Sequence, residues 1–184
     1  MNIFILDLNP VQAAKFYPDK LCNKISLEIC QMLATNFSED FLNWGEIHKK
    51  NGKPYKKSFP NHPCTVWMRK NNENLAWSIV HGLALAHQHY KRFGKMPATY
   101  HTLIQAKNIF KEKTQQPLAI YKNVSKFARA MPENLKYNRN INDIEAYREY
   151  LHTKTYPKWE KLNNIPFWWG QTKLKTVKYT VPTW

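Results

Sequence analysis

The feature that most constrains the fold is a long stretch with helical periodicity and a clear signal at each end. Asn71 or Asn72 can cap a helix over about residues 73–93, and Gly94 suits the position just after its last turn. Apolar side chains recur along one face, at Leu75, Ile79, Leu83, Ala86 and Tyr90. The opposite face carries Glu73, Trp77, His81, Gln88 and Lys91. The sequence therefore predicts one long amphipathic helix with a single buried face.

Further helices are predicted on both sides of this one. Asn9-Pro10 opens a short helix, and Pro18-Asp19 begins a longer one that runs to about Thr35. The other predicted elements are a helix over 39–48 capped by Ser38, an irregular basic loop over 49–66, helices over 100–113 and 123–130, a helix from Asn142 to Tyr150, a buried strand or extended segment over 1–8, and a possible strand over 177–181. The sequence thus predicts a mainly α, single compact helical domain over 1–184, with long ordered loops and an extended basic C-terminal arm over 169–184.

The charge of the chain is strongly positive. There are 28 Lys and Arg residues against 13 Asp and Glu, which gives a net charge of +15 at pH 7. Such a field attracts polyanions, and nucleic acid is the leading partner, with DNA favoured over RNA and an anionic membrane surface as the alternative. No stretch approaches the roughly 20 apolar residues of a transmembrane helix, so membrane insertion is not expected. Cys22, Cys30 and Cys64 have no CxxC spacing, which favours reduced thiols and a cytoplasmic location.

A proline-bracketed Asn61-His62 pair stands directly after a run of lysines. The prolines at 60 and 63 fix their own backbone and push the preceding residues toward extended geometry, so His62 is expected in a stiff loop. Five lysines precede the pair and Arg69 follows it; the lysines are Lys49, Lys50, Lys53, Lys56 and Lys57. Such a loop can present chemistry to a polyanion, and it can equally be a structural turn whose histidine satisfies backbone groups.

The predicted helix over 19–35 carries a polar stripe at helical spacing, made of Lys20, Lys24, Glu28 and Gln31. A lysine with a lowered pKa can attack a sugar or base carbon, and a neighbouring carboxylate can move the proton. The alternative interpretation is a solvated helix face. The histidines have no metal-ligand spacing and the chain has no glycine-rich phosphate loop, so no metal and no cofactor are predicted. Cys64 is interpreted as a buried small hydrophobe.

Motifs spread over most of the chain occur in a fixed order: Asp19-Lys20, Lys24, Glu28, Gln31-Met32-Leu33, then Asn61-His62-Pro63-Cys64, Trp67, Arg69, Asn74, Trp77, then Ala130-Met131-Pro132-Glu133, Ala146-Tyr147-Arg148, Tyr150 and Pro166-Phe167-Trp168-Trp169. This pattern resembles a family of small phage and large-virus proteins. It has a fainter similarity to the pyrimidine-dimer DNA glycosylases. The second resemblance implies an all-α protein that binds duplex DNA, flips a nucleotide, and uses an amine nucleophile with a glutamate. For a phage-encoded protein, the expected location is the host cytoplasm.

The leading hypothesis is therefore a DNA glycosylase/lyase-like enzyme acting on a flipped nucleotide. In this hypothesis an amine attacks the sugar C1′ carbon. The attacking amine belongs to Lys20, to Lys24 or to Met1, which is expected to be retained because Asn2 is bulky. Glu28 is the proton carrier and His62 a second catalytic candidate. Flanking phosphates or the base would be held by Asn61, Arg69, Tyr147 and Arg148, together with the five lysines. The alternatives are a non-enzymatic DNA- or RNA-binding protein and a nucleotide- or base-modifying transferase. The enzyme hypothesis predicts that Glu28, His62 and Arg148 share one basic pocket.

Overall fold

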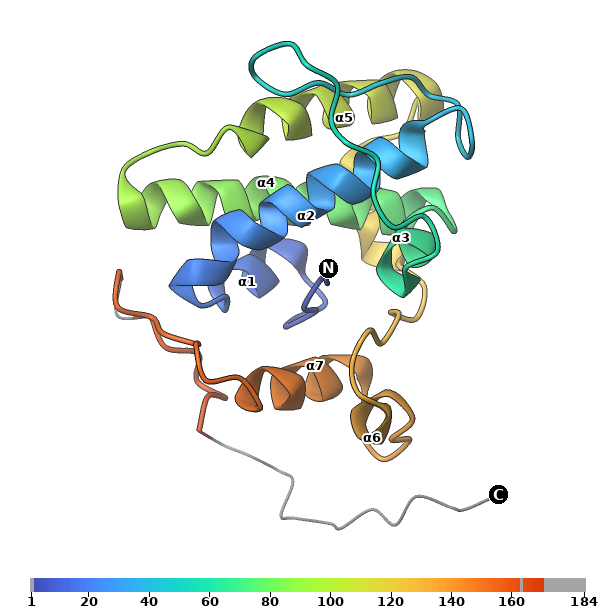
Figure 1. Cartoon of the computed structure of the whole chain (residues 1–184). Coiled ribbons are helices and arrows are strands. Elements are labelled where there is room, and N and C mark those ends of the chain that lie inside the picture. The colour runs from blue at the N-terminus through green and yellow to red at the C-terminus, as the bar shows by residue number, and fades with distance from the viewer. Residues whose placement is uncertain (1, 163, 171–184) are drawn as a thin grey trace.

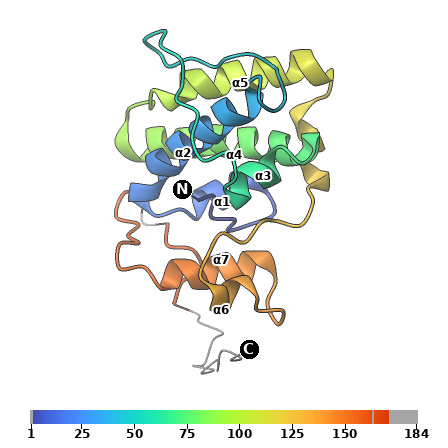
Figure 2. The same ribbon diagram turned by 45° about the vertical axis from the view of Figure 1, so that its right-hand side comes forward.

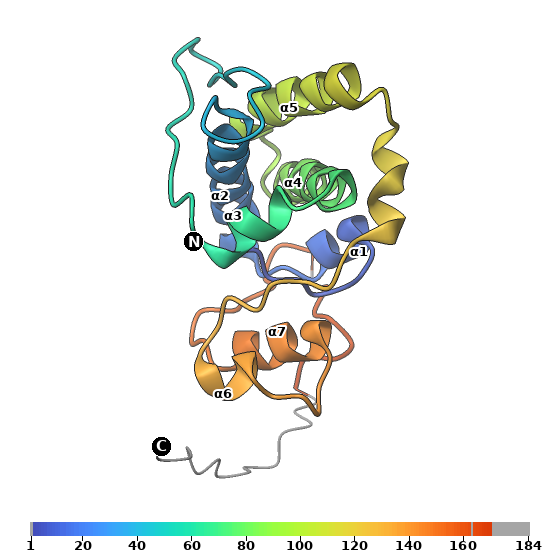
Figure 3. The same ribbon diagram turned by 90° about the vertical axis from the view of Figure 1, so that its right-hand side faces the viewer.

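A single long helix, α4 (Asn72–Phe93), forms the centre of the fold. The computed structural model describes residues 2–162 and 164–170. Four elements pack around α4: α1 (Pro10–Lys15), α2 (Asp19–Phe37), α5 (Thr99–Thr114) and the 3₁₀-helix η1 (Leu118–Asn123). Figure 3 looks nearly along α4 and shows these elements arranged around it. The mainly α domain expected from the sequence is confirmed, and within the described residues His48 and Pro54 form an isolated bridge rather than a sheet.

The ends of α4 lie where the sequence predicts them, but the division into a buried and an exposed face does not follow the prediction. Asn71 caps the first turn by accepting from the Asn74 backbone, and Gly94 follows the helix with a φ of 70°. The predicted polar face is buried at Trp77, His81 and Gln88, whereas Tyr90, expected in the core, is exposed. The two-faced interpretation was wrong because neighbours cover α4 on most sides. Buried polar groups on such a helix are tolerated only with hydrogen-bond partners, which Trp77 and His81 have.

A second, smaller layer lies below this group in Figures 1 and 2. It contains α6 (Glu133–Lys136), α7 (Asp143–His152) and the segment that follows α7. The N-terminal segment, blue in both figures, runs between the two layers, and residues 3–6 are almost fully buried. Phe4 stacks on the α7 ring of Tyr150 and meets the rings of Tyr17 and Tyr147 edge-on. Of the expected extended segment over 1–8, residues 3–6 are therefore buried through their side chains, without strand pairing among the described residues.

Three local predictions were wrong. The helix expected over 39–48 is absent, because the Ser38 hydroxyl donates to the Thr35 carbonyl and ends α2, while Gly45 has a φ of 103°. The helix expected over 123–130 is replaced by η1 before it and by extended chain after it. The loop expected over 49–66 ends earlier, because α3 (Pro63–Met68) begins within it. In the first and third cases a side chain caps a different helix end from the one expected, namely Ser38 at the end of α2 and His62 at the start of α3.

The last described residues complete the lower layer. The side chain of Trp168 is buried against the rings of Phe16 and His152, whereas Phe167 is exposed. The predicted strand over 177–181 and most of the predicted arm over 169–184 lie outside the described residues. The three cysteines are free and buried. None of the helices described in the structure is both long and apolar enough to cross a membrane.

Candidate active site

Asn2 brings together three segments that are far apart in the sequence. Its backbone nitrogen donates to the Glu28 carboxylate at 2.7 Å, so the start of the described chain is tied to the middle of α2. Its side-chain amide donates to the carbonyl of Ala130 at 2.7 Å. Its side-chain oxygen accepts from the thiol of Cys64, in the first turn of α3, at 3.8 Å. A carboxylate, a backbone nitrogen and the start of a helix therefore meet at one place.

His62 lies at the start of α3, where it is the N-cap residue. Its ring nitrogen Nδ1 accepts from the backbone nitrogen of Cys64 at 3.2 Å, and Pro63 occupies the first helical position. Because Nδ1 accepts, the neutral ring carries its hydrogen on Nε2. The stiffness expected around His62 therefore has a structural cause, which is helix capping. Cys64, two residues after His62, contacts Asn2, and Asn2 is bonded to Glu28. His62 is therefore connected to Glu28 through two intermediate residues, Cys64 and Asn2.

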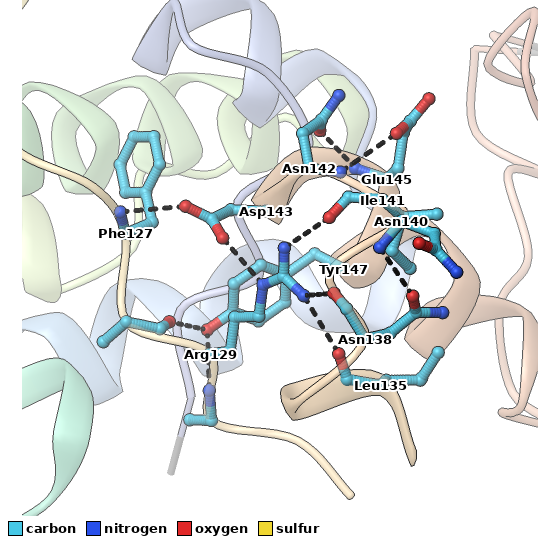
Figure 4. A network of polar contacts seen from close by, with 12 residues as sticks. Phe127, Arg129, Leu135, Asn138, Asn140, Ile141, Asn142, Asp143, Glu145 and Tyr147 are labelled. Atoms are coloured by element: carbon cyan, nitrogen blue, oxygen red, sulfur yellow. Dashed lines mark hydrogen bonds and ion pairs between the residues drawn. The ribbon is translucent and has the colours of Figure 1, made fainter. Parts of the chain in front are cut away.

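Tyr147, on α7, is bonded to the segment that carries Ala130. Its hydroxyl donates to the carbonyl of Ala128 at 2.6 Å and accepts from the backbone nitrogen of Ala130 at 3.2 Å. The ring is fully buried, so the side chain holds the segment that carries Ala130 instead of reaching solvent. Figure 4 shows this contact beside the Arg129 network, in which the guanidinium pairs with Asp143 at 2.7 Å and donates to three backbone carbonyls. The segment that carries Ala130 is thus held by both Tyr147 and Arg129.

Burial keeps the weak acids next to Glu28 neutral at physiological pH. Burial, with a smaller contribution from the negative charge of Glu28, raises the pKa of the Cys64 thiol to about 11. Burial likewise raises the pKa of Tyr17 and of Tyr147, and the charge of Glu28 contributes at Tyr17. A thiol with such a pKa is almost entirely protonated at pH 7, so Cys64 is a poor nucleophile. Among these neighbours, Glu28 is the carboxylate available for proton transfer.

Lys20 and Lys24 lie on the same side of α2 as Glu28, two turns and one turn before it. Both lysine side chains are exposed, whereas Glu28 and Gln31 are half-buried. The polar stripe is therefore neither a fully solvated face nor a buried one. It passes from solvent at Lys20 into the contact with the N-terminal segment at Glu28.

Arg148 lies elsewhere. Its guanidinium donates twice to the carbonyl of Leu6, at 2.8 and 3.1 Å, and approaches the Asp7 carboxylate at 3.9 Å. It also stacks on Trp168, with 5.0 Å between the guanidinium carbon and the ring centroid, and burial lowers its pKa. Glu28 and the start of α3 therefore meet around Asn2, while Arg148 holds the other end of the N-terminal segment and borders a separate cavity of about 260 Å³.

The remaining basic candidates divide into anchored and exposed groups. Arg69 donates to the carbonyl of Pro60 at 2.7 Å and to Asn36 at 3.3 Å, and stacks on Phe41, so it fixes the loop before α3. Asn61 is exposed beside it. The five lysines are all exposed: Lys49, Lys50, Lys53, Lys56 and Lys57, the last of which pairs with Asp40 at 3.3 Å. Among the exposed lysines, Lys57 would give up its ion pair and Lys49 its contact with the Tyr55 ring on reaching a polyanion, whereas Arg69 would release the loop before α3.

Sequence reasoning missed Asn2 and Ala130 as parts of the site. No periodicity connects residue 2 to residue 28 or residue 130, because these contacts depend on how three segments pack. Within the described residues, no group of three or more His, Cys, Asp or Glu side chains could hold a metal ion. Comparisons of the chain with protein-family models, with curated proteins and with solved structures gave no match. The resemblances noted above therefore remain predictions.

Proposed function

We propose that the protein is a nucleic-acid-acting enzyme of the DNA glycosylase/lyase type, with Glu28 as its proton-transferring carboxylate. The observation that carries the proposal is the 2.7 Å hydrogen bond from the backbone nitrogen of Asn2 to Glu28. It brings a carboxylate to Asn2, the first residue that the structure describes. The same carboxylate lies one helical turn after the exposed Lys24 amine. An amine beside a carboxylate is the minimal machinery for imine chemistry at a sugar carbon.

The reaction can be written with these groups alone. The neutral amine nitrogen forms a bond to the sugar C1′ carbon as the C1′–base bond breaks, and the base leaves with the bonding electron pair. The attacking nitrogen loses a proton to the Glu28 carboxylate, which passes it to the departing base. Opening of the sugar ring moves the second amine proton, through the same carboxylate, to the ring oxygen and leaves a neutral imine between the enzyme and C1′. The nucleophile is the terminal amine of the chain or Lys24, and the experiment below distinguishes the two.

The charge distribution supports a nucleic-acid substrate. The net charge is +15, and the exposed lysines of the 49–57 segment add positive charge that is largely outside ion pairs among the described residues. In Figure 3 the chain after this segment descends beside α2 to α3, next to which Asn2 lies. Binding to duplex DNA should therefore weaken steeply with salt, by about 0.9 log units of affinity per log unit of salt for each phosphate contact.

Borohydride trapping tests the proposal directly. The protein is incubated with duplexes that contain abasic sites, pyrimidine dimers or no lesion, and the imine is reduced to a stable covalent adduct. Glu28→Gln should reduce adduct formation by about a hundredfold, a typical effect of losing an acid–base group. Glu112→Gln, on the exposed surface of α5, has the same charge change and should react like the wild type. Absence of an adduct on every duplex would contradict the enzyme proposal.

Peptide mapping of the adduct identifies the amine. An adduct on the first peptide assigns the reaction to the terminal amine, and the intact mass of the protein shows which residue carries it. An adduct on the peptide that contains Lys24 assigns it to α2. Lys24→Gln should abolish trapping if Lys24 is the nucleophile, and should leave trapping unchanged if the terminal amine is.

A non-enzymatic nucleic-acid-binding protein is the second candidate. The observation in its favour is that Arg148 and Arg69 are committed to structural contacts, so the exposed lysines remain as the principal candidates for phosphate contacts. This candidate predicts salt-dependent DNA binding without an adduct and without any effect of Glu28→Gln on affinity.

A further inference from the structure

A cavity of about 610 Å³ lies on the side of α2 away from Glu28. It is bounded by α2, by the turn between α4 and α5, and by the segment 47–55, which we call the lysine hairpin. We call the cavity the lysine pocket. Its lining includes three lysines, namely Lys49, Lys50 and Lys95. An adjoining cavity of about 410 Å³ shares Lys50 and Lys95 with it.

The lysine hairpin is held in place by backbone contacts. His48 pairs with Pro54 in a bridge, and the Lys49 nitrogen donates to the Lys53 carbonyl at 2.9 Å. The hairpin is also bound to α5, because the His48 carbonyl accepts from the Thr102 hydroxyl at 2.9 Å and its nitrogen donates to the Gln105 side chain at 3.0 Å. The backbone positions of Lys49 and Lys50 are therefore defined by the fold, so little ordering is needed to bring their amines to a ligand.

The polar residues beneath the lysine pocket are also connected. The hydroxyl of Ser26 on α2 donates to that of Thr99 on α5 at 2.8 Å, and the thiol of Cys30 donates to the Thr99 carbonyl at 3.8 Å. Tyr55 shares a side-chain hydrogen bond with Cys30, and burial raises the pKa of both groups. This side of α2 is thus joined both to the hairpin and to the first turn of α5.

The charge around the lysine pocket is positive and not neutralised. None of the residues that line it is Asp or Glu, and Lys49, Lys50 and Lys95 take part in none of the ion pairs found among the described residues. Neutral hydrogen-bonding side chains complete the lining, among them Asn23 and Asn51. Lysine amines and neutral donors around a cavity of this size suit a phosphate-bearing ligand of roughly nucleotide dimensions.

The position of the lysine pocket on α2 relates it to Glu28. At 100° per residue, Asn23 and Leu27 of the pocket lining are followed around the helix by Lys20, then Lys24, then Glu28. Lys20 and Lys24 are exposed, so positively charged surface runs from the pocket to the candidate active site. A strand lying across α2 could contact both places at once.

We propose that the lysine pocket binds backbone phosphates of the nucleic acid on which the Glu28 site acts. The recognised chemistry is the phosphate group, held by Lys49, Lys50 and Lys95 and by the neutral donors around them. The assignment of that phosphate to a nucleic-acid strand rests on the proposed function. The pocket lies on the other side of Lys20 and Lys24 from Glu28, so it contributes affinity and register without taking part in the chemical step.

The test compares two triple variants of the full chain that lose the same charge. One is Lys49→Gln/Lys50→Gln/Lys95→Gln, and the control is Lys107→Gln/Lys111→Gln/Lys122→Gln, at exposed positions on α5 and η1. Affinity for a fluorescent DNA duplex is measured by anisotropy over a range of salt. The pocket variant should bind about tenfold or more weakly and lose about 2 to 3 units of log–log salt slope, and the control should change affinity by less than about twofold. Equal losses in both variants would show a net-charge effect and overturn the proposal.

Amide NMR shifts with inorganic pyrophosphate and with a short oligonucleotide identify the source of the phosphate. Shifts at Lys49–Asn51 and Lys95–Thr99 with the oligonucleotide alone support a strand site, and shifts with both ligands support a site that also takes free phosphates. No shift with either ligand overturns the proposal. Pocket-dependent binding without borohydride trapping would remove the enzyme proposal and leave the phosphate site. If the pocket variant forms as much trapped adduct as the wild type at subsaturating DNA, the enzyme proposal stands and the phosphate-site proposal is overturned.

Discussion

The Glu28 carboxylate lies 2.7 Å from the backbone nitrogen of Asn2, although 26 residues separate them in the chain. This contact shows that the polar stripe on α2 is not solvated along its whole length. A solvated face would leave Glu28 among water molecules, whereas here it receives a hydrogen bond from the N-terminal segment. The charge of Glu28 also contributes to the raised pKa of Tyr17 and of Cys64. Glu28 therefore positions the beginning of the chain whatever chemistry follows.

Removing the Glu28 carboxylate should lower stability as well as activity. In Glu28→Ala the Asn2 nitrogen loses its acceptor, so we expect a cost of about 1 kcal/mol in the free energy of unfolding. Glu28→Gln retains an acceptor oxygen and should unfold nearly like the wild type, which separates catalysis from stability. Urea denaturation followed by tryptophan fluorescence measures both. Lys24→Gln, an exposed neighbour, is the control. Equal stability of Glu28→Ala and wild type would mean that the contact contributes nothing.

The sequence was sufficient to predict the helices whose ends carry local signals. Asn71, Gly94 and Asn142 mark the ends of α4 and the start of α7 through side-chain capping or a positive φ, and these effects act within one turn. Ser38 was misassigned because the same hydroxyl can cap a following helix or close a preceding one. Only the packing of residues 41–45 against the end of α2 decides between them, through bonds such as that from the Trp44 nitrogen to the Phe37 carbonyl.

The candidate site was predictable only in part. Helical spacing alone placed Lys20, Lys24 and Glu28 on one face of α2. The arrival of Asn2 at Glu28 depends on the N-terminal segment passing between two layers, which no local pattern records. The separation of Arg148 from Glu28 likewise follows from its bonds to the Leu6 carbonyl, 142 residues away in the chain. Long-range contacts of this kind determine which polar side chains become neighbours.

The absence of a side chain at Gly82 on α4 leaves room for side chains of two neighbouring helices. A Cβ atom there would lie 2.6 Å from the Leu103 side chain on α5 and 3.2 Å from Ile29 on α2. Gly82→Ala should therefore destabilise the protein by about 1 to 3 kcal/mol despite the better helix propensity of alanine. The double variant Gly82→Ala/Leu103→Val should recover part of the loss, as measured by a double-mutant cycle of unfolding free energies. If Gly82→Ala were more stable than the wild type, the side chains of Leu103 and Ile29 would have moved aside at no cost, and the prediction would be wrong.

The Tyr147 hydroxyl should contribute to stability in addition to its ring. Tyr147→Phe keeps the buried aromatic volume but removes the acceptor of the Ala130 nitrogen and the donor to the Ala128 carbonyl. Leaving these buried groups unpaired should cost about 1 to 3 kcal/mol in the free energy of unfolding. The matched control is Tyr150→Phe, on the same helix and only half-buried, which should change stability by less than about 0.5 kcal/mol. Similar effects in the two variants would argue against a specific role for the Tyr147 hydroxyl.

His81 should make the fold sensitive to acid. The ring is fully buried between Trp77 and Tyr17, and burial lowers its pKa to about 4. Nδ1 lies 2.9 Å from the Pro10 carbonyl, so the neutral ring donates from that nitrogen, and Nε2 faces the Tyr17 hydroxyl at 3.2 Å. Protonation would place an unpaired charge in the core between α4 and the N-terminal segment.

The sign of the pH dependence follows from the two pKa values. In the unfolded chain the histidine pKa is about 6.5, so between about pH 6.5 and pH 4 the unfolded state binds the additional proton. Unfolding is therefore favoured as the pH falls through this range, and the stability present above pH 6.5 should drop by about 3 kcal/mol from this residue. Urea denaturation at a series of pH values measures it. His81→Gln should be less stable at neutral pH but should show a much flatter dependence. His101→Gln, at an exposed position, should keep the wild-type slope. A wild-type slope retained in His81→Gln would assign the acid sensitivity to other groups.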